Sequence, residues 1–143
     1  MKYLLDSDFL FGLAVENDPH HKTSKRLYSN FKRGNVELLV LNLVVQETAT
    51  VISKKRSQEE SIKFLDLFRD LPVQLILLDL ELEKNSWKIF EKQTKKGTSF
   101  IDCANLATLE KYKLDGILSF DEFYPKEVSY QRLIDLRDPL GGL

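Results

Sequence analysis

The sequence of 143 residues predicts an α/β fold in which helices cover both faces of a parallel sheet. Short apolar segments of strand length alternate with longer segments whose apolar residues recur at helical spacing. The order is strand, helix, helix throughout, and a last strand closes the pattern. A third observation is that acidic residues stand where strands end. Ligands of such sheets bind outside the carboxyl ends of the strands, so these acids are candidate site residues.

Composition bounds the class of protein. With 43% hydrophobic and 30% charged residues, we expect a globular chain with a single domain over residues 1–143. No apolar run is long enough to cross a membrane, and Asp6 leaves no room for a signal peptide. The lone cysteine, Cys103, allows no internal disulfide, so we expect a cytoplasmic protein. A net charge of −1 argues against nucleic-acid binding by bulk electrostatics, although local basic patches remain compatible with it.

The first strand, Lys2–Leu5, ends at an acid. Asp6, Ser7 and Asp8 are all able to cap the short helix that follows. Because the helix needs only one cap, at least one of the two aspartates is available for another role.

A second helix begins near His20, after the break at Pro19, and ends around Gly34. His20 and His21 are adjacent and point about 100° apart, so we interpret them as surface residues and not as ligands of one metal.

The next strand and helix, Val36–Leu41 and Asn42–Lys55, contain a less cap-like acid. Glu47 lies between Val44 and Val51 on the apolar stripe of this helix. A carboxylate turned toward the sheet is costly unless it is paired or binds a cation. A salt bridge to a nearby lysine is the competing explanation.

A capping box at Ser57 opens the fourth predicted helix. Its expected inward residues are Ile62, Leu65, Phe68 and Leu71. Pro72 ends it, and a strand follows over Val73–Leu78. Asp79 then caps a helix that we expect to run through Lys96 and to stop at Gly97. We also expect a partner groove among these apolar helices, near Phe31, Phe64 and Phe68.

The segment 98–124 carries the remaining acids. Ser99 caps a helix that begins at Phe100, and Asp102 lies in its first turn. A strand is expected over residues 116–120, with Asp121 at its end, and a weak strand over 130–136 precedes a frayed tail at 138–142. Each acid also has a structural explanation: Asp102 completes a capping box with Ser99, and Asp121 caps a turn.

The topology brings these acids toward one edge of the sheet. Carboxylates that converge without basic partners repel one another, and hard divalent cations such as Mg²⁺ or Mn²⁺ relieve that repulsion. This arrangement suits hydrolysis of a phosphodiester. The four acids that we expect to converge are Asp6, Glu47, Asp102 and Asp121.

The motifs LLDSDFLFGL, VVQETATVI, SFIDCANLA and ILSFDEFY together resemble the PIN-domain family, and within it the VapC-type toxins of toxin–antitoxin pairs. The resemblance covers nearly the whole chain. It implies a three-layer α/β/α sandwich with a central, mostly parallel sheet of about five strands. It also implies an Mg²⁺- or Mn²⁺-dependent endoribonuclease that cuts RNA, is often a homodimer and is inhibited by a cognate antitoxin.

Carried over by position, the resemblance makes Asp6, Glu47, Asp102 and Asp121 the metal-binding catalytic acids. It gives supporting roles to three further residues. Ser99 matches a small hydroxyl position, Asp8 lies where polar residues vary and can touch metal through water, and Asn105 can face the cleft.

Other classes stay open at this point. A receiver-type phosphoacceptor domain also has acids at strand ends, but the lysine that it needs after its last strand is missing here. A PIN scaffold that binds RNA or protein without cleaving is a second alternative, against which the four intact acids count. A nuclease of RNA maturation or quality control is a third. The short chain, without an appended RNA-binding module, favours the toxin.

Overall fold

The computed structural model describes residues 1–129, within which four strands form one parallel sheet in the order β3-β2-β1-β4. The strands are β1 (Lys2–Leu5), β2 (Glu37–Leu41), β3 (Val73–Ile76) and β4 (Gly116–Leu118). An isolated parallel bridge joins Ile117 to Ser129 beyond β4. The predicted strand over 130–136 and the tail at 138–142 lie outside the described residues.

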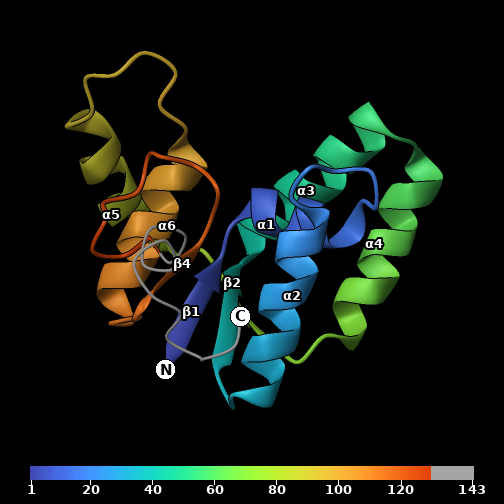
Figure 1. Cartoon of the computed structure of the whole chain (residues 1–143). Coiled ribbons are helices and arrows are strands. Elements are labelled where there is room, and N and C mark those ends of the chain that lie inside the picture. The colour runs from blue at the N-terminus through green and yellow to red at the C-terminus, as the bar shows by residue number, and fades with distance from the viewer. Residues whose placement is uncertain (130–143) are drawn as a thin grey trace.

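Helices cover both faces of this sheet. They are α1 (Ser7–Ala14), α2 (His21–Arg33), α3 (Asn42–Lys55), α4 (Gln58–Asp70), α5 (Leu80–Glu91) and α6 (Phe100–Lys111). Figure 1 shows the α5–α6 pair on one side of the sheet and α1 to α4 on the other. The predicted α/β/α architecture is therefore confirmed, with four strands in residues 1–129 where about five were expected. None of the helices in this range is long and apolar enough to cross a membrane.

The two central strands, β1 and β2, form the middle of the core. Leu4, Leu5, Val40 and Leu41 are completely buried, as expected for parallel strands covered on both faces. Because β1 pairs with both β2 and β4, the residue that follows it, Asp6, lies in the middle of the carboxyl edge of the sheet.

Two strands end earlier than the apolar runs predict. β2 ends at Leu41, which pairs with Ile76, so β3 has no partner for its backbone beyond that residue. The N–H of Leu78 instead donates to Oδ1 of Asn42 at 2.9 Å. The last strand likewise stops at Leu118, because that residue pairs with Leu5, where β1 ends.

The apolar face of α4 is rotated from the prediction. Ile62 is 50% exposed, whereas Phe64 is buried. Ser61 is also buried, and its hydroxyl donates to the carbonyl of Ala49 at 2.7 Å, which lets α4 approach α3 closely. The inward stripe therefore follows Ser61 and Phe64, and the prediction for Ile62 is wrong.

Helix α5 ends at Glu91, not at Lys96. The residues from 91 to 97 include no apolar side chain, so a longer helix would have nothing to pack against the core. Its last turn tightens, since the Lys92 N–H bonds the carbonyls of Ile89 and Phe90. Gly97 has a φ of +86° but lies beyond the helix end.

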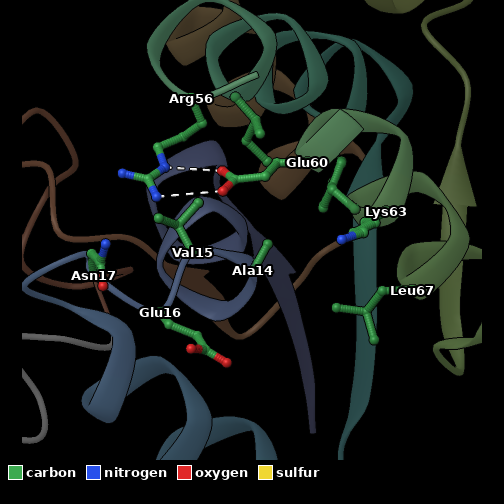
Figure 2. A pocket seen from close by; sticks show the side chains of 10 residues that line it. Ala14, Val15, Glu16, Asn17, Arg56, Glu60, Lys63 and Leu67 are labelled. Atoms are coloured by element: carbon green, nitrogen blue, oxygen red, sulfur yellow. Dashed lines mark hydrogen bonds and ion pairs between the residues drawn. The ribbon is translucent and has the colours of Figure 1, made fainter. Parts of the chain in front are cut away.

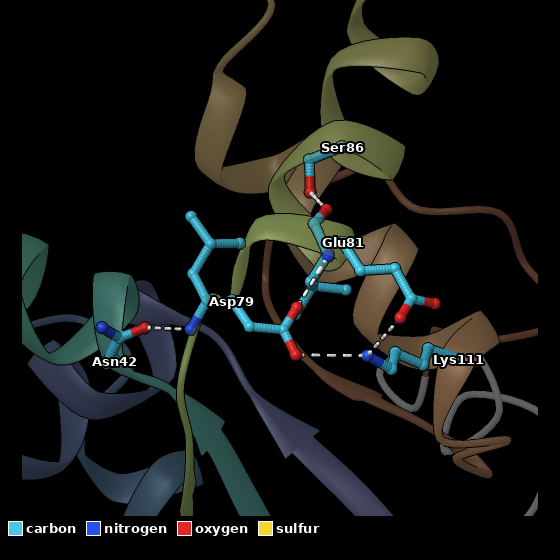
Figure 3. Close-up of polar contacts among 7 residues, drawn as sticks. Asn42, Asp79, Glu81, Ser86 and Lys111 are labelled. Carbon is cyan, nitrogen blue, oxygen red and sulfur yellow. Dashed lines mark hydrogen bonds and ion pairs between the residues drawn. The ribbon is translucent and has the colours of Figure 1, made fainter.

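The start of α5 confirms its predicted cap. Oδ1 of Asp79 accepts from the Leu82 N–H at 2.8 Å, and its Oδ2 lies 3.4 Å from Nζ of Lys111 on α6 (Figure 3). Lys111 also pairs with Glu81 at 3.8 Å, so one lysine ties the two helices together.

We expect Gly12→Ala to lower the free energy of unfolding by about 1–3 kcal/mol. A Cβ at Gly12 would lie 2.7 Å from Oγ of Ser24 on α2, a buried atom with no hydrogen-bond partner within residues 1–129. Removing that oxygen with Ser24→Ala should restore part of the loss. Urea unfolding of both single variants and the double variant measures the coupling; strict additivity would contradict the contact.

Candidate acidic site

The register of β1 and β4 builds the centre of the site. Leu5 pairs with Leu118, and the Asp6 N–H donates to the Leu118 carbonyl at 3.1 Å. The residues that follow the two strands, Asp6 and Ser119, therefore meet at the carboxyl edge of the sheet.

Asp6 is 3% exposed, and three donors hold its carboxylate. Oδ1 accepts from the Ser7 N–H at 2.8 Å, which makes Asp6 the cap of α1, and from Nδ2 of Asn105 at 3.2 Å. Oδ2 accepts from the Ser119 hydroxyl at 2.7 Å. Burial raises the pKa of Asp6, and the negative charge of Glu47 adds to the rise. Asn105, for which a place facing the cleft is predicted, is completely buried, and its amide contacts Asp6.

Asp8 is the acid left over once Asp6 serves as cap. Its Oδ2 accepts from the Phe120 N–H at 3.0 Å, whereas its buried Oδ1 has no hydrogen-bond partner among residues 1–129. Burial, together with the charge of Asp6, raises the pKa of Asp8 to about 8. A buried carboxylate with a vacant acceptor position is costly unless a cation or donor reaches it.

Asp102 lies in the first turn of α6. Its Oδ1 accepts from the Tyr124 hydroxyl at 3.0 Å. Burial and then the charge of Asp6 raise the pKa of Asp102 to about 7. Ser99 caps this helix as predicted. Its hydroxyl oxygen accepts from the Ile101 N–H at 3.1 Å, and not from the Asp102 N–H as a capping box requires. Asp102 therefore serves the cluster, and the capping box with Ser99 does not form.

The two remaining predicted acids, Glu47 and Asp121, come from α3 and from the segment after β4. Glu47 is half-buried on α3, and no salt bridge to it exists within residues 1–129, so the predicted lysine partner is not found there. Asp121 is exposed, and its Oδ1 accepts from the Phe123 N–H at 3.0 Å, which confirms its role in a turn. The negative charges of both add to the raised pKa of Asp102, after burial and the charge of Asp6.

Sequence reasoning missed two residues of the site. The buried Ser119 hydroxyl lies between Asp6 and Asp8 and accepts from the Asp121 N–H at 3.0 Å. The buried Tyr124 hydroxyl accepts from Nδ2 of Asn105 at 3.0 Å and donates to Asp102. Burial and the nearby charges keep the pKa of Tyr124 far above its usual range, so the phenol stays a donor.

The donor set suits a hard divalent cation. Carboxylate oxygens predominate, no lysine or arginine within residues 1–129 pairs with any of these acids, and Oδ1 of Asp8 is buried without a partner. Even so, no three acidic, histidine or cysteine side chains in that part of the chain stand close enough to ligate one ion in their present rotamers. The chemistry of the donors therefore fits a divalent metal, whereas the positions of these side chains do not place three ligands around one ion.

We expect Tyr124→Phe to lower the free energy of unfolding by about 1–2 kcal/mol, because one N–H of the buried Asn105 amide would lose its acceptor and Asp102 would lose a donor. Tyr112→Phe is the matched control, since that tyrosine is 41% exposed at the end of α6. Equal stability of the two variants in urea would contradict the network around Tyr124.

A cavity of about 360 Å³ lies away from the acids, between the end of α1 and helices α3 and α4 (Figure 2). Phe64 and Leu67 line it, and Arg56 pairs with Glu60 across it at 2.9 Å. The predicted partner groove is wrong in one respect, because Phe31 is completely buried in the core. The surface around Phe64 does contain a cavity.

Solved structures share this fold. VapC20 of Mycobacterium tuberculosis, described as a sarcin–ricin loop cleaving toxin, superposes with a TM-score of 0.76 at 20% identity, over 85% of this chain and 91% of that one. A chain of VapBC2 from Rickettsia felis, solved bound to a DNA fragment from their promoter, gives 0.69 at 12% identity, over 90% and 97%.

Curated proteins provide no sequence match to the chain. The family comparison does, because the sequence model of the PIN domain matches residues 3–126, nearly the whole of the described fold. The chain belongs to the PIN-domain family.

Proposed function

We propose that this PIN-domain protein is a divalent-metal-dependent endoribonuclease. The observation that carries the proposal is the cluster of Asp6, Asp8 and Asp102, whose pKa values are all raised and which have no cationic partner within residues 1–129. A protein retains such repulsion at a cost to stability, and a bound cation is the most direct reason to retain it.

The residues that would hold Mg²⁺, or Mn²⁺, are Asp6, Glu47, Asp102 and Asp121. When bound, the ion supplies a Lewis acid for the phosphate and lowers the pKa of water to make a nucleophile. Asn105 and Ser119 hold the Asp6 carboxylate by its two oxygens, and Tyr124 orients Asp102. Ser99 fixes the start of α6, and Asp8 offers its free oxygen to water at the site.

The biological role that we propose is that of a toxin in a toxin–antitoxin pair. This is supported by the fold shared with VapC20 and with a chain of the VapBC2 complex. By the same likeness, we propose RNA as substrate and a cognate antitoxin as inhibitor. The resemblance of the motifs to VapC-type toxins leads us to propose a homodimer as the working form, and the lone cysteine leads us to propose the cytoplasm as its compartment.

Purified protein incubated with a mixed RNA pool tests the activity. We expect cleavage with Mg²⁺ or Mn²⁺ and none with EDTA. Because a copurified antitoxin would mimic an inactive enzyme, the protein is purified under denaturing conditions and refolded. No cleavage, together with no heat of metal binding in calorimetry, would instead indicate a PIN scaffold that binds without cutting.

A further inference from the structure

A second, smaller cavity of about 230 Å³ adjoins the acidic cluster. Asp8 on α1 and Thr48 on α3 line it, the latter next to Glu47. Its other walls come from Ser7 and Phe11 on α1, from Asp18 and His20 in the turn before α2, and from Val51 and Lys55 on α3. The cavity therefore connects the carboxylates to an aromatic ring and a cation.

The imidazole of His20 is exposed but held in place. It stacks on Phe120 with ring centroids 3.9 Å apart and planes inclined by 6°. Phe120 in turn stacks on the buried Phe9 at 6.4 Å, and its N–H donates to Asp8. A stack that begins in the core thus ends at an exposed ring beside the acids.

The turn that carries His20 is also fixed. Oδ2 of Asp18 accepts from the His20 N–H at 3.0 Å, and Nδ1 of His21 lies 2.7 Å from the carbonyl of Gly12. An exposed aromatic ring in a fixed orientation stacks a nucleobase at little entropic cost, because it has no freedom left to lose.

Helix α3 places an acid and a base on one of its faces. Glu47, Val51 and Lys55 are four residues apart and share one face, so Lys55 lies about 12 Å beyond Glu47 along the axis. Lys55 has no carboxylate partner within residues 1–129, and its Nζ lies 5.9 Å from the ring centroid of Phe11. An anionic strand that approaches the acids needs such a cation, since the acids themselves repel phosphate.

We propose that this cavity binds the nucleotide next to the scissile phosphate of a single-stranded RNA. His20 stacks the base, and Lys55 neutralises a phosphate further along the strand. The inference rests on the proposed nuclease function, which it deepens by assigning residues that select the substrate.

Binding of fluorescein-labelled single-stranded RNA of roughly ten nucleotides tests the subsite. The four homopolymers are titrated in Mg²⁺ against the Asp102→Asn protein, with and without His20→Ala, and followed by fluorescence anisotropy. We expect His20→Ala to weaken binding about 5- to 100-fold for at least one homopolymer. His20→Phe, which keeps a ring, should restore most of the affinity, and Tyr112→Ala should change nothing.

The lysine is tested with its neighbour as the matched control. Lys55→Ala should weaken the binding of all four homopolymers alike and reduce the slope of log K against log salt by about 0.7. Lys54 is exposed and lies outside the cavity, so Lys54→Ala should have neither effect.

Equal losses for Lys54→Ala and Lys55→Ala, an unchanged affinity of His20→Ala, or no rescue by His20→Phe would overturn the subsite. If any of these results is found while the wild-type protein still cleaves RNA with metal, the proposed nuclease function is retained and only the subsite is wrong. A wild-type protein that neither binds nor cuts RNA would overturn both.

Discussion

Asp102→Asn should abolish RNA cleavage, with a loss greater than the roughly 100-fold that removal of an outer-shell partner of a metal ligand costs. The amide removes a ligand charge but little volume, and its oxygen can still accept from the Tyr124 hydroxyl. Asp6→Asn should have the same effect. Its amide nitrogen can face the Ser119 hydroxyl, which accepts as readily as it donates, so the buried network survives.

The control for this prediction is Glu110→Gln, which removes an exposed carboxylate from the same helix as Asp102. Initial rates with a labelled RNA, together with circular dichroism of each variant, separate lost chemistry from lost structure. Normal cleavage by both aspartate variants, with metal present, would show that the site assignment is wrong.

Without divalent metal, the protein should become less stable as the pH rises from about 4 to about 8. The pKa of Asp8 is raised to about 8 and that of Asp102 to about 7 in the folded chain, against about 3.9 for an unfolded aspartate. The folded state therefore binds more protons across this range, and its extra stability, complete below pH 4, is lost as the pH passes the folded pKa values. Asp8→Asn should recover several kcal/mol at pH 8, since each unit by which the pKa is raised corresponds to about 1.4 kcal/mol, and little at pH 4.

Urea unfolding in EDTA at several pH values measures this effect. Asp70→Asn, which removes an exposed carboxylate outside the cluster at the end of α4, is the matched control. Added Mg²⁺ should raise the stability of the wild type at pH 8 more than at pH 5, because only the ionised carboxylates bind it. A wild type whose stability rises steadily with pH would contradict mutual repulsion in the cluster.

Local signals in the sequence were enough to predict most of the fold. Caps at Ser57, Asp79 and Ser99 mark helix starts, and the structure has all three. Strand ends were harder, because a strand stops where its neighbour stops pairing. That is why β3 ends at Ile76 within an apolar run that continues to Leu78.

The site residues also fall into two groups, those with a local signal in the sequence and those whose role depends on a distant residue. Asp6 and Asp121 follow apolar strands, and Glu47 interrupts an apolar stripe, so each carries a local signal. Ser119 and Tyr124 carry none, because what gives them a role is a contact with a residue distant in sequence. The Ser119 hydroxyl bonds an aspartate 113 positions away, a distance that no periodicity encodes.

That same span has a consequence for synthesis on the ribosome. β1 is made before the other three strands of this sheet, yet one of its two neighbours is β4, and the side-chain partners of Asp6 come from positions 105 and 119. When β1 has paired with β2, its other edge stays unpaired until β4 has been made. A nascent chain that has not yet emerged as far as Tyr124 therefore lacks the assembled carboxylate network, because Asn105 and Asp102 still miss their common partner.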